Sequence, residues 1–274
     1  MSGNRWLIRR RPTVAFHGFT LVEVLVVVGV IALLVLFVLP TVTDRRPPGR
    51  TFCQSNTKQL AIAWLMYATD YNDRLVRNQA YAGMPIAPTN NWVYGMMDWS
   101  ANPDNTNANV FVDPAKSLFG GYNKNPAAYH CPADDSVSAA GPRVRSYSMN
   151  GFMGDTGRGP ALSGWRQYLK TSDLKAPAQK FVIGDEHPNS IDDGYFLNDP
   201  AGTNTWLDLP TSRHDGAAVF AFADGHAELH RWVDASTRKP VVLKAPKASV
   251  PIPPSQFQDF TWLQQRATEP WTNH

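Results

Sequence analysis

Three side chains that could bind a metal ion occupy alternate positions late in the sequence. His226, Glu228 and His230 are each two residues apart, so in a β-strand they would project from one face about 7 Å apart. Imidazole nitrogens and a carboxylate are ligands of zinc and other transition metals, and His214 could approach as a fourth. The alternative interpretation is the polar, solvent-facing side of an antiparallel hairpin. Both interpretations remain open from the sequence.

A β-hairpin is the element expected to position these side chains. Asp224-Gly225 separates two apolar runs, and Asp-Gly is a strong signal for a two-residue turn. Such a turn would place Ala223 opposite His226. The side chains expected on the core-facing side are those of Phe220, Phe222, Ala227 and Leu229.

Two further groups of polar residues contain neighbouring carboxylates. They are Gly184-Asp185-Glu186-His187 and Asp192-Asp193-Gly194. Carboxylate oxygens bind Ca²⁺, but neither group has the spacing of an EF-hand loop. We interpret both as solvated turns and keep calcium or a transition metal as the alternative; no other cofactor is expected.

The N-terminal region contains a long apolar run. Residues 19–39 include one charged side chain, Glu23, and as a helix they would extend about 30 Å, the thickness of the hydrocarbon core of a bilayer. The run is apolar on every face, unlike an amphipathic surface helix. We therefore predict a transmembrane helix over residues 19–40.

The distribution of charge predicts an orientation and argues against one class of partner. Arg5, Arg9, Arg10 and Arg11 precede the apolar run without any acidic residue, which favours a cytoplasmic N-terminus and a periplasmic or extracellular location for the rest of the chain. Of 26 basic residues, 22 remain without these four, against 23 acidic residues, so the remainder has a net charge of −1. We therefore expect no nucleic-acid partner.

The chain has only two cysteines, Cys53 and Cys131. Outside the cytoplasm a disulfide between them is permitted, and it would close a loop of nearly 80 residues worth roughly 4 kcal/mol. Two buried free thiols are the alternative. Neither cysteine has the C-x-x-C spacing of a redox or zinc motif.

The residues before and within the apolar run carry a resemblance to a known family. Gly18-Phe19-Thr20-Leu21-Val22-Glu23 resembles the signal of type IV prepilins and type II secretion pseudopilins. The resemblance implies that prepilin peptidase cleaves between Gly18 and Phe19 and that Phe19 is then N-methylated. It also implies that Glu23 pairs with the terminal amine of a neighbouring subunit during assembly.

Three shorter motifs are similar to those of a large group of pilin-like proteins. They are the stretch from Cys53 to Asp70, the stretch from Tyr129 to Asp134, and His214 followed after nine residues by Asp224-Gly225. The last motif has no assigned chemistry. We predict that His214 and Asp224 are structural and fix the turn and the strand ends.

The expected fold class is α+β: an N-terminal transmembrane helix, then a pilin-like ectodomain in which a helix packs on an antiparallel sheet with long loops. Apolar spacing predicts the ectodomain helix over residues 51–70. Short apolar runs predict strands at 92–94 and 180–183, and a strand entering a turn at 147–151.

The expected organisation has five parts. They are a leader (1–18), the transmembrane and assembly helix (19–40), a hinge (41–50), a periplasmic ectodomain (51–234), and a Pro-rich linker with a short C-terminal helix (235–274).

These features predict a non-enzymatic, pilin-like or pseudopilin subunit of a type II secretion or type IV pilus-like filament. The expected partners are prepilin peptidase, other pilin or pseudopilin subunits and the inner membrane. One alternative is a membrane-anchored adhesin or carbohydrate-binding protein, in which tryptophans in loop-like stretches stack on sugars: Trp92, Trp99, Trp165 and Trp206. A second alternative is a metal-dependent hydrolase that uses the hairpin of residues 214–230.

Overall fold

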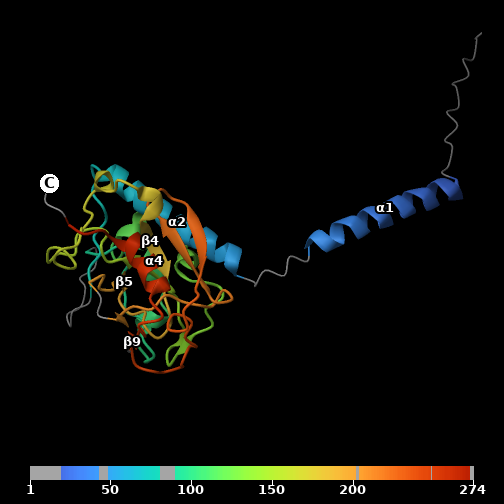
Figure 1. The fold of residues 1–274 in the computed structure, drawn as a ribbon. Coiled ribbons are helices and arrows are strands. Elements are labelled where there is room, and N and C mark those ends of the chain that lie inside the picture. Colours follow the sequence, from blue (N-terminus) through green and yellow to red (C-terminus); the bar gives the residue numbers. More distant parts are fainter. Residues whose placement is uncertain (1–19, 43–48, 81–89, 202–203, 248, 272–274) are drawn as a thin grey trace, which may run out of the picture. The chain divides into compact units, whose positions relative to one another are not determined.

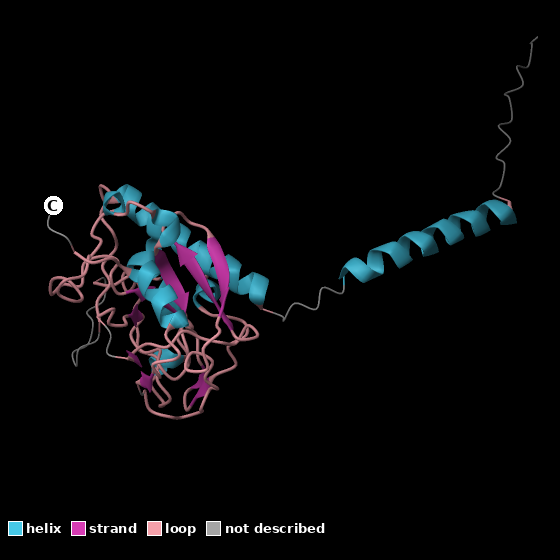
Figure 2. Ribbon diagram, viewed as in Figure 1, coloured by secondary structure: helices cyan, strands magenta, loops and turns pink. Residues whose placement is uncertain are grey.

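The protein divides into two compact units, residues 1–46 and 47–274. The computed structural model describes residues 20–42, 49–80, 90–201, 204–247 and 249–271. Figure 1 follows the chain by residue number, and Figure 2 distinguishes helices, strands and loops. The predicted leader, most of the predicted hinge and the last three residues lie outside the described residues.

The first unit contains one helix, α1 (Leu21–Val42), among its described residues. In the part of the chain that the structure describes, no helix is both long enough and apolar enough to cross a membrane. The predicted transmembrane helix is therefore wrong, and with it the fold class as stated.

The second unit begins with α2 (Arg50–Asp70), which confirms the helix expected over residues 51–70. The helix follows Gly49, whose φ of +116° suits a residue without a Cβ. One face of α2 is buried against β4, β7 and β8. Its buried residues are Cys53, Thr57, Leu60, Ala61, Ala63, Trp64, Tyr67 and Ala68.

A five-stranded sheet forms the centre of this unit in the order β5-β3-β4-β7-β8. The strands are β3 (Tyr147–Asn150), β4 (Phe181–Asp185), β5 (Tyr195–Phe196), β7 (Ala217–Phe222) and β8 (Ala227–Arg231). Three of the four pairings are antiparallel, but β5 runs parallel to β3. The expected antiparallel sheet is thus a mixed one.

The β7–β8 hairpin differs from its prediction by one residue of register. Ala221 pairs with Ala227 and Phe220 with Glu228, so three residues, 223–225, connect the strands rather than two. Gly225 adopts φ +88°, as in a type I turn followed by a left-handed glycine. Because side chains alternate across a strand, the shift moves Phe220 to the face of Glu228 instead of the face of Leu229.

The other expected strands had mixed outcomes. Strands β3 and β4 confirm the predictions near residues 147–151 and 180–183. Residues 92–94 form no strand; Trp92 is buried and its backbone N–H donates to Arg77 O in an irregular segment.

The remaining elements are short. They are α3 (Asn109–Val112), the 3₁₀ helices Pro103–Asn105, Leu118–Gly121, Pro126–Tyr129, Thr171–Asp173 and Pro177–Gln179, and the strands β1 (Val137–Ser138), β2 (Gly141–Pro142), β6 (Thr205–Trp206) and β9 (Val250–Pro251).

The C-terminal region packs on the body rather than forming a separate tail. Strand β9 pairs with β6, and helix α4 (Gln258–Ala267) buries Phe260 and Leu263. Phe260 packs edge-on against Trp206, with ring centroids 4.9 Å apart. The predicted short C-terminal helix is present, and it belongs to the core.

Candidate functional site

The predicted N-terminal signal is described only in part. Gly18 and Phe19 lie outside the described residues, so cleavage between them and methylation of Phe19 stay predictions. Glu23 Oε2 accepts hydrogen bonds from the backbone N–H and the hydroxyl of Thr20 at 2.8 and 2.9 Å, and Glu23 N–H donates to Thr20 Oγ1 at 3.3 Å. This reciprocal pattern is a capping box at the start of α1. Within one chain, the Glu23 carboxylate therefore caps its own helix.

A cluster of buried polar groups lies where α2, β4 and the start of β7 meet. Cys53 and Cys131 form a disulfide, which confirms that expectation. Nε2 of His214 lies 3.4 Å from Cys131 Sγ and 3.4 Å from Asp185 Oδ2. All four residues are fully buried. We call these residues (Cys53, Cys131, Asp185 and His214) the cysteine–histidine cluster.

Each member is positioned by its own element. Cys53 lies in the first turn of α2, and Asp185 is the last residue of β4. The Asn56 side-chain amide donates to His130 O at 2.9 Å, which ties α2 to the loop carrying Cys131. His214 lies in the turn before β7, where Gly216 N–H donates to Ser212 O at 2.9 Å.

Arg213 and Asp134 surround the cluster with charge. Arg213 Nη2 lies 3.0 Å from Asp134 Oδ2, and Arg213 Nη1 lies 3.6 Å from Asp185 Oδ1. Asp134 also accepts a hydrogen bond from the Ser146 hydroxyl at 2.8 Å. Burial alone would raise the pKa of Asp134, but Arg213 and the serine hydroxyls together hold that pKa below its usual value.

Asp185 has a less complete set of partners than Asp134. Among the described residues, neither oxygen of Asp185 is assigned a hydrogen bond of normal geometry. Burial raises the pKa of this carboxyl, and His214 and Arg213 offset the rise only in part. A buried carboxylate with so little direct donation is costly, so the Arg213 guanidinium is an important source of its stabilisation.

The His-x₉-Asp-Gly motif spans β7 and places its residues at opposite ends of that strand. His214 precedes the strand, at the disulfide, while Asp224 closes the hairpin. Asp224 Oδ1 accepts from the backbone N–H of His226 at 3.1 Å and pairs with its Nδ1 at 2.5 Å. These contacts place Asp224 at the hairpin turn, and the structural role expected of both residues stays a prediction.

The hairpin residues proposed as metal ligands have separate partners. His226 stacks on Phe222 with ring centroids 4.5 Å apart, and His230 stacks on Trp262 of α4 at 3.5 Å. Burial, with the nearby Arg266 charge, lowers the pKa of His230 to about 4. Within the described residues, the one group of three or more candidate ligands close enough to share a metal ion is the cysteine–histidine cluster, and Glu228 is not in it.

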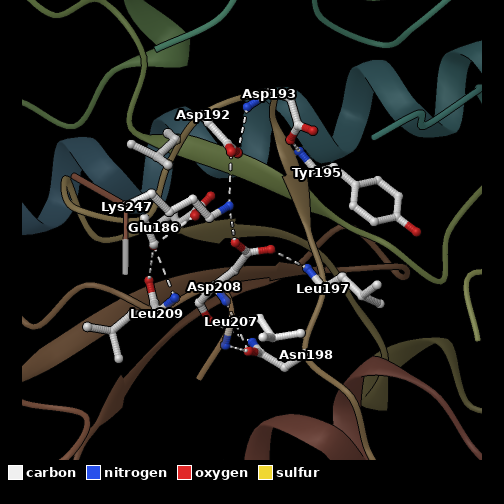
Figure 3. Close-up of polar contacts among 12 residues, drawn as sticks. Glu186, Asp192, Asp193, Tyr195, Leu197, Asn198, Leu207, Asp208, Leu209 and Lys247 are labelled. Carbon is white, nitrogen blue, oxygen red and sulfur yellow. Dashed lines mark hydrogen bonds and ion pairs between the residues drawn. The ribbon is translucent and has the colours of Figure 1, made fainter. Parts of the chain in front are cut away.

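The two carboxylate groups noted in the sequence meet around a lysine (Figure 3). Lys247 Nζ lies 2.7 Å from Asp208 Oδ1 and 3.0 Å from Asp192 Oδ2. Glu186 is buried beside them and accepts a hydrogen bond from the Ser190 hydroxyl at 2.8 Å. The lysine ammonium thus lies between two of these carboxylates.

Burial controls the protonation of these acids. It raises the pKa of Asp208 to about 6, against the opposing effect of Lys247, and it raises the pKa of Glu186 well above its usual value. The carboxylates in turn raise the pKa of Lys247. The ammonium therefore stays charged and fastens the segment around residue 247 to the body.

No family model, curated protein or solved structure matches the chain. The resemblance to prepilins accordingly rests on the sequence motifs alone.

The tryptophans considered as sugar-stacking platforms are mostly engaged within the protein. Trp92 and Trp206 are fully buried. Trp99 is partly buried and carries the Arg143 guanidinium 4.9 Å from its ring centroid. Trp165 is partly buried as well. Buried rings offer no face to a ligand, so two of the four positions cannot serve in this way.

Sequence reasoning missed several residues of these clusters. The sequence indicates Asp185 only as part of a turn. Its approach to His214 has no sequence signal, because Asp185 ends β4 and His214 lies in the turn before β7. Asp208 and Lys247 were not singled out at all. Both lie in segments with ordinary loop composition, and only the folded chain brings them together.

Proposed function

We propose that the protein is a pilin-like subunit of a type II secretion or type IV pilus-like filament, without enzymatic activity. Its partners would be prepilin peptidase and other pilin-like subunits, and it would assemble at the inner membrane with residues 47–274 outside the cytoplasm. The observation that carries the proposal is an apolar helix, α1, that lies in a compact unit separate from the body and follows the prepilin-like residues 18–23.

The surface of α1 supports assembly because it cannot remain in water. Every described residue from Leu21 to Leu34 is exposed, with Leu21 at 79% and Leu34 at 59% of full exposure. A continuous apolar surface of this kind marks an interaction site. The occupant that we propose is the α1 helix of other copies or related subunits, because Glu23 is the single charge on this helix and is placed at its first turn.

The body supports a location outside the cytoplasm. The Cys53–Cys131 disulfide would persist in an oxidising compartment and is rarely found in cytosolic proteins. The body also has the arrangement expected for a pilin-like ectodomain in one respect, a long helix lying along a sheet.

The test separates the two roles available to Glu23. Glu23→Val removes the carboxylate that would pair with a neighbouring subunit's amine and also the capping box. Thr20→Val removes only the hydroxyl half of the capping box and leaves the carboxylate in place. In cells, we expect Glu23→Val to abolish the ladder of chemically cross-linked multimers and Thr20→Val to retain it. If both variants assemble like wild type, the pairing role is wrong, and if both fail equally, Glu23 acts only as a helix cap.

A further inference from the structure

The cysteine–histidine cluster brings four potential metal-ligand atoms together in the interior of the body. The two cysteine sulfurs, a nitrogen of His214 and an oxygen of Asp185 all lie within 4.8 Å of one another. They come from α2, from the loop before β1, from β4 and from the turn before β7. The convergence therefore depends on the tertiary fold and has no counterpart in a local motif.

The distances suit a tetrahedral site. Zinc binds sulfur at about 2.3 Å and nitrogen or oxygen at about 2.0–2.2 Å, so neighbouring ligand atoms lie about 3.3–3.8 Å apart along the edges of the tetrahedron. Nε2 of His214 lies 3.4 Å from Cys131 Sγ and 3.4 Å from Asp185 Oδ2. The nitrogen is thus as far from the sulfur and from the carboxylate oxygen as ligands of one common ion would be.

The hydrogen bonding also leaves these atoms available. Within the described residues, Nδ1 of His214 and both oxygens of Asp185 have no assigned hydrogen-bond partner although they are buried. Buried polar atoms are normally satisfied, so a polar cluster with three such atoms is unusual. A metal ion held by Nε2 of His214 and one oxygen of Asp185 would satisfy one of these three atoms directly.

We propose that, when Cys53 and Cys131 are reduced, these thiolates together with His214 and Asp185 bind one Zn²⁺ ion. The disulfide first accepts two electrons and two protons: two reductant thiols supply both and become a disulfide, or a phosphine supplies the electrons and water the protons and the oxygen of the phosphine oxide. The products at Cys53 and Cys131 are two thiols. Zinc binding then releases both thiol protons to solvent, while His214 binds as the neutral imidazole. Disulfide formation removes both thiolates, so the site binds metal only in the reduced protein.

The charges around the cluster suit this ion. Two thiolates and one carboxylate with Zn²⁺ give a net charge of −1, and Nη1 of the Arg213 guanidinium lies 3.6 Å from Asp185 Oδ1. The donor set also selects among metals, because two thiolates and an imidazole favour zinc over calcium or magnesium. This inference is independent of the proposed filament function.

The test compares the full chain in its reduced and disulfide forms. One sample is reduced with a phosphine and the other keeps the disulfide. Both are equilibrated with Zn²⁺, freed of unbound metal and analysed for zinc per chain. Co²⁺ replaces Zn²⁺ in a parallel experiment as a spectroscopic probe of tetrahedral thiolate coordination. We expect one zinc per reduced chain and none per disulfide chain. Loss of a supporting group around a ligand costs about 10–100-fold in affinity, so Asp185→Asn, which removes a ligand itself, should weaken binding at least about tenfold.

His226→Gln is the matched control, because His226 is a partly exposed histidine outside the cluster. It should bind zinc like wild type, whereas Cys53→Ser/Cys131→Ser should bind none. The proposal is overturned if the reduced chain holds no stoichiometric zinc, or if the disulfide form or the double serine variant holds as much. Circular dichroism covers the case in which reduction unfolds the body: zinc should then restore the fold, and a chain that zinc does not restore also overturns the proposal.

Discussion

Loss of the Cys53–Cys131 disulfide should destabilise the body by an amount that its loop length predicts. The bond joins residues 78 apart in the sequence, and the chain-entropy model assigns a loop of this size about 4.5 kcal/mol at 25 °C. Both sulfurs are fully buried, between α2 and the loop before β1. Replacement by alanine therefore removes a constraint on the unfolded chain and leaves the solvent-exposed surface of the body almost unchanged.

The assay is thermal and urea unfolding of the full chain, followed by tryptophan fluorescence with a chelator present, so that bound metal does not contribute. Cys53→Ala/Cys131→Ala should lower the free energy of unfolding by about 4 kcal/mol and the melting temperature by roughly 8–16 °C for a unit of this size. The single variants Cys53→Ala and Cys131→Ala serve as controls, because each breaks the same bond and should cost nearly as much as the double variant.

A loss below about 1 kcal/mol in the double variant would refute this reasoning. It would mean either that the unfolded chain retains the contact between α2 and the Cys131 loop, or that the bond strains the folded body as much as it restrains the unfolded chain. Unfolding of the reduced wild-type protein is the control, because reduction breaks the same bond without introducing alanine side chains.

Three further predictions concern the body. Lys247→Met should lower the free energy of unfolding by about 2 kcal/mol at pH 7, because it leaves the buried Asp208 carboxylate (7% exposed) without its ammonium partner; this figure is discounted for the 41% exposure of the lysine. The loss should shrink toward pH 5, because Asp208, whose pKa is about 6, takes up a proton. The control variant, exposed Lys244→Met, should show no measurable loss. Gly225→Ala should cost about 1 kcal/mol in urea unfolding, because its φ is +88°. Burial lowers the pKa of His187 to about 4, so the stability gained by keeping it neutral is complete above pH 6.5 and is lost as the pH falls toward 4; a wild-type stability curve compared with that of His187→Gln checks this slope.

The parts of the fold that could be predicted carry strong local signals. Helix α2 follows from apolar residues spaced three and four apart, and Leu60, Trp64 and Tyr67 of this pattern are buried in the structure. The disulfide follows from a cysteine count of two and an expected compartment. The apolar stretch of β4 likewise predicts a strand that is buried throughout.

The parts that could not be predicted depend on single residues or on tertiary contacts. Asp-Gly is compatible with both a two-residue and a three-residue connection, and this choice alone decides whether Phe220 lies on the face of Leu229 or of Glu228. The stacking of His230 on Trp262 depends on a helix that packs from the far end of the chain. The alternate spacing of His226, Glu228 and His230 alone favours a metal site, because it does not show that His230 stacks on Trp262.

The candidate site shows the same division. His214 was singled out by its motif, yet its neighbours Asp185 and Cys131 come from other elements and lie 29 and 83 residues away. Nothing in the sequence distinguishes Lys247 from the other lysines of its segment, although its ammonium lies between the carboxylates of Asp192 and Asp208. Long-range pairing of charges is set by the fold and not by local pattern.

The most direct test of the proposed function is the mass of the N-terminal peptide of the protein purified from its native cells. Processing as a prepilin predicts a peptide that begins at Phe19 and carries one methyl group on its amine. A chain that still begins at Met1, in cells with an active prepilin peptidase, would contradict the proposal that this protein enters a pilin-like filament.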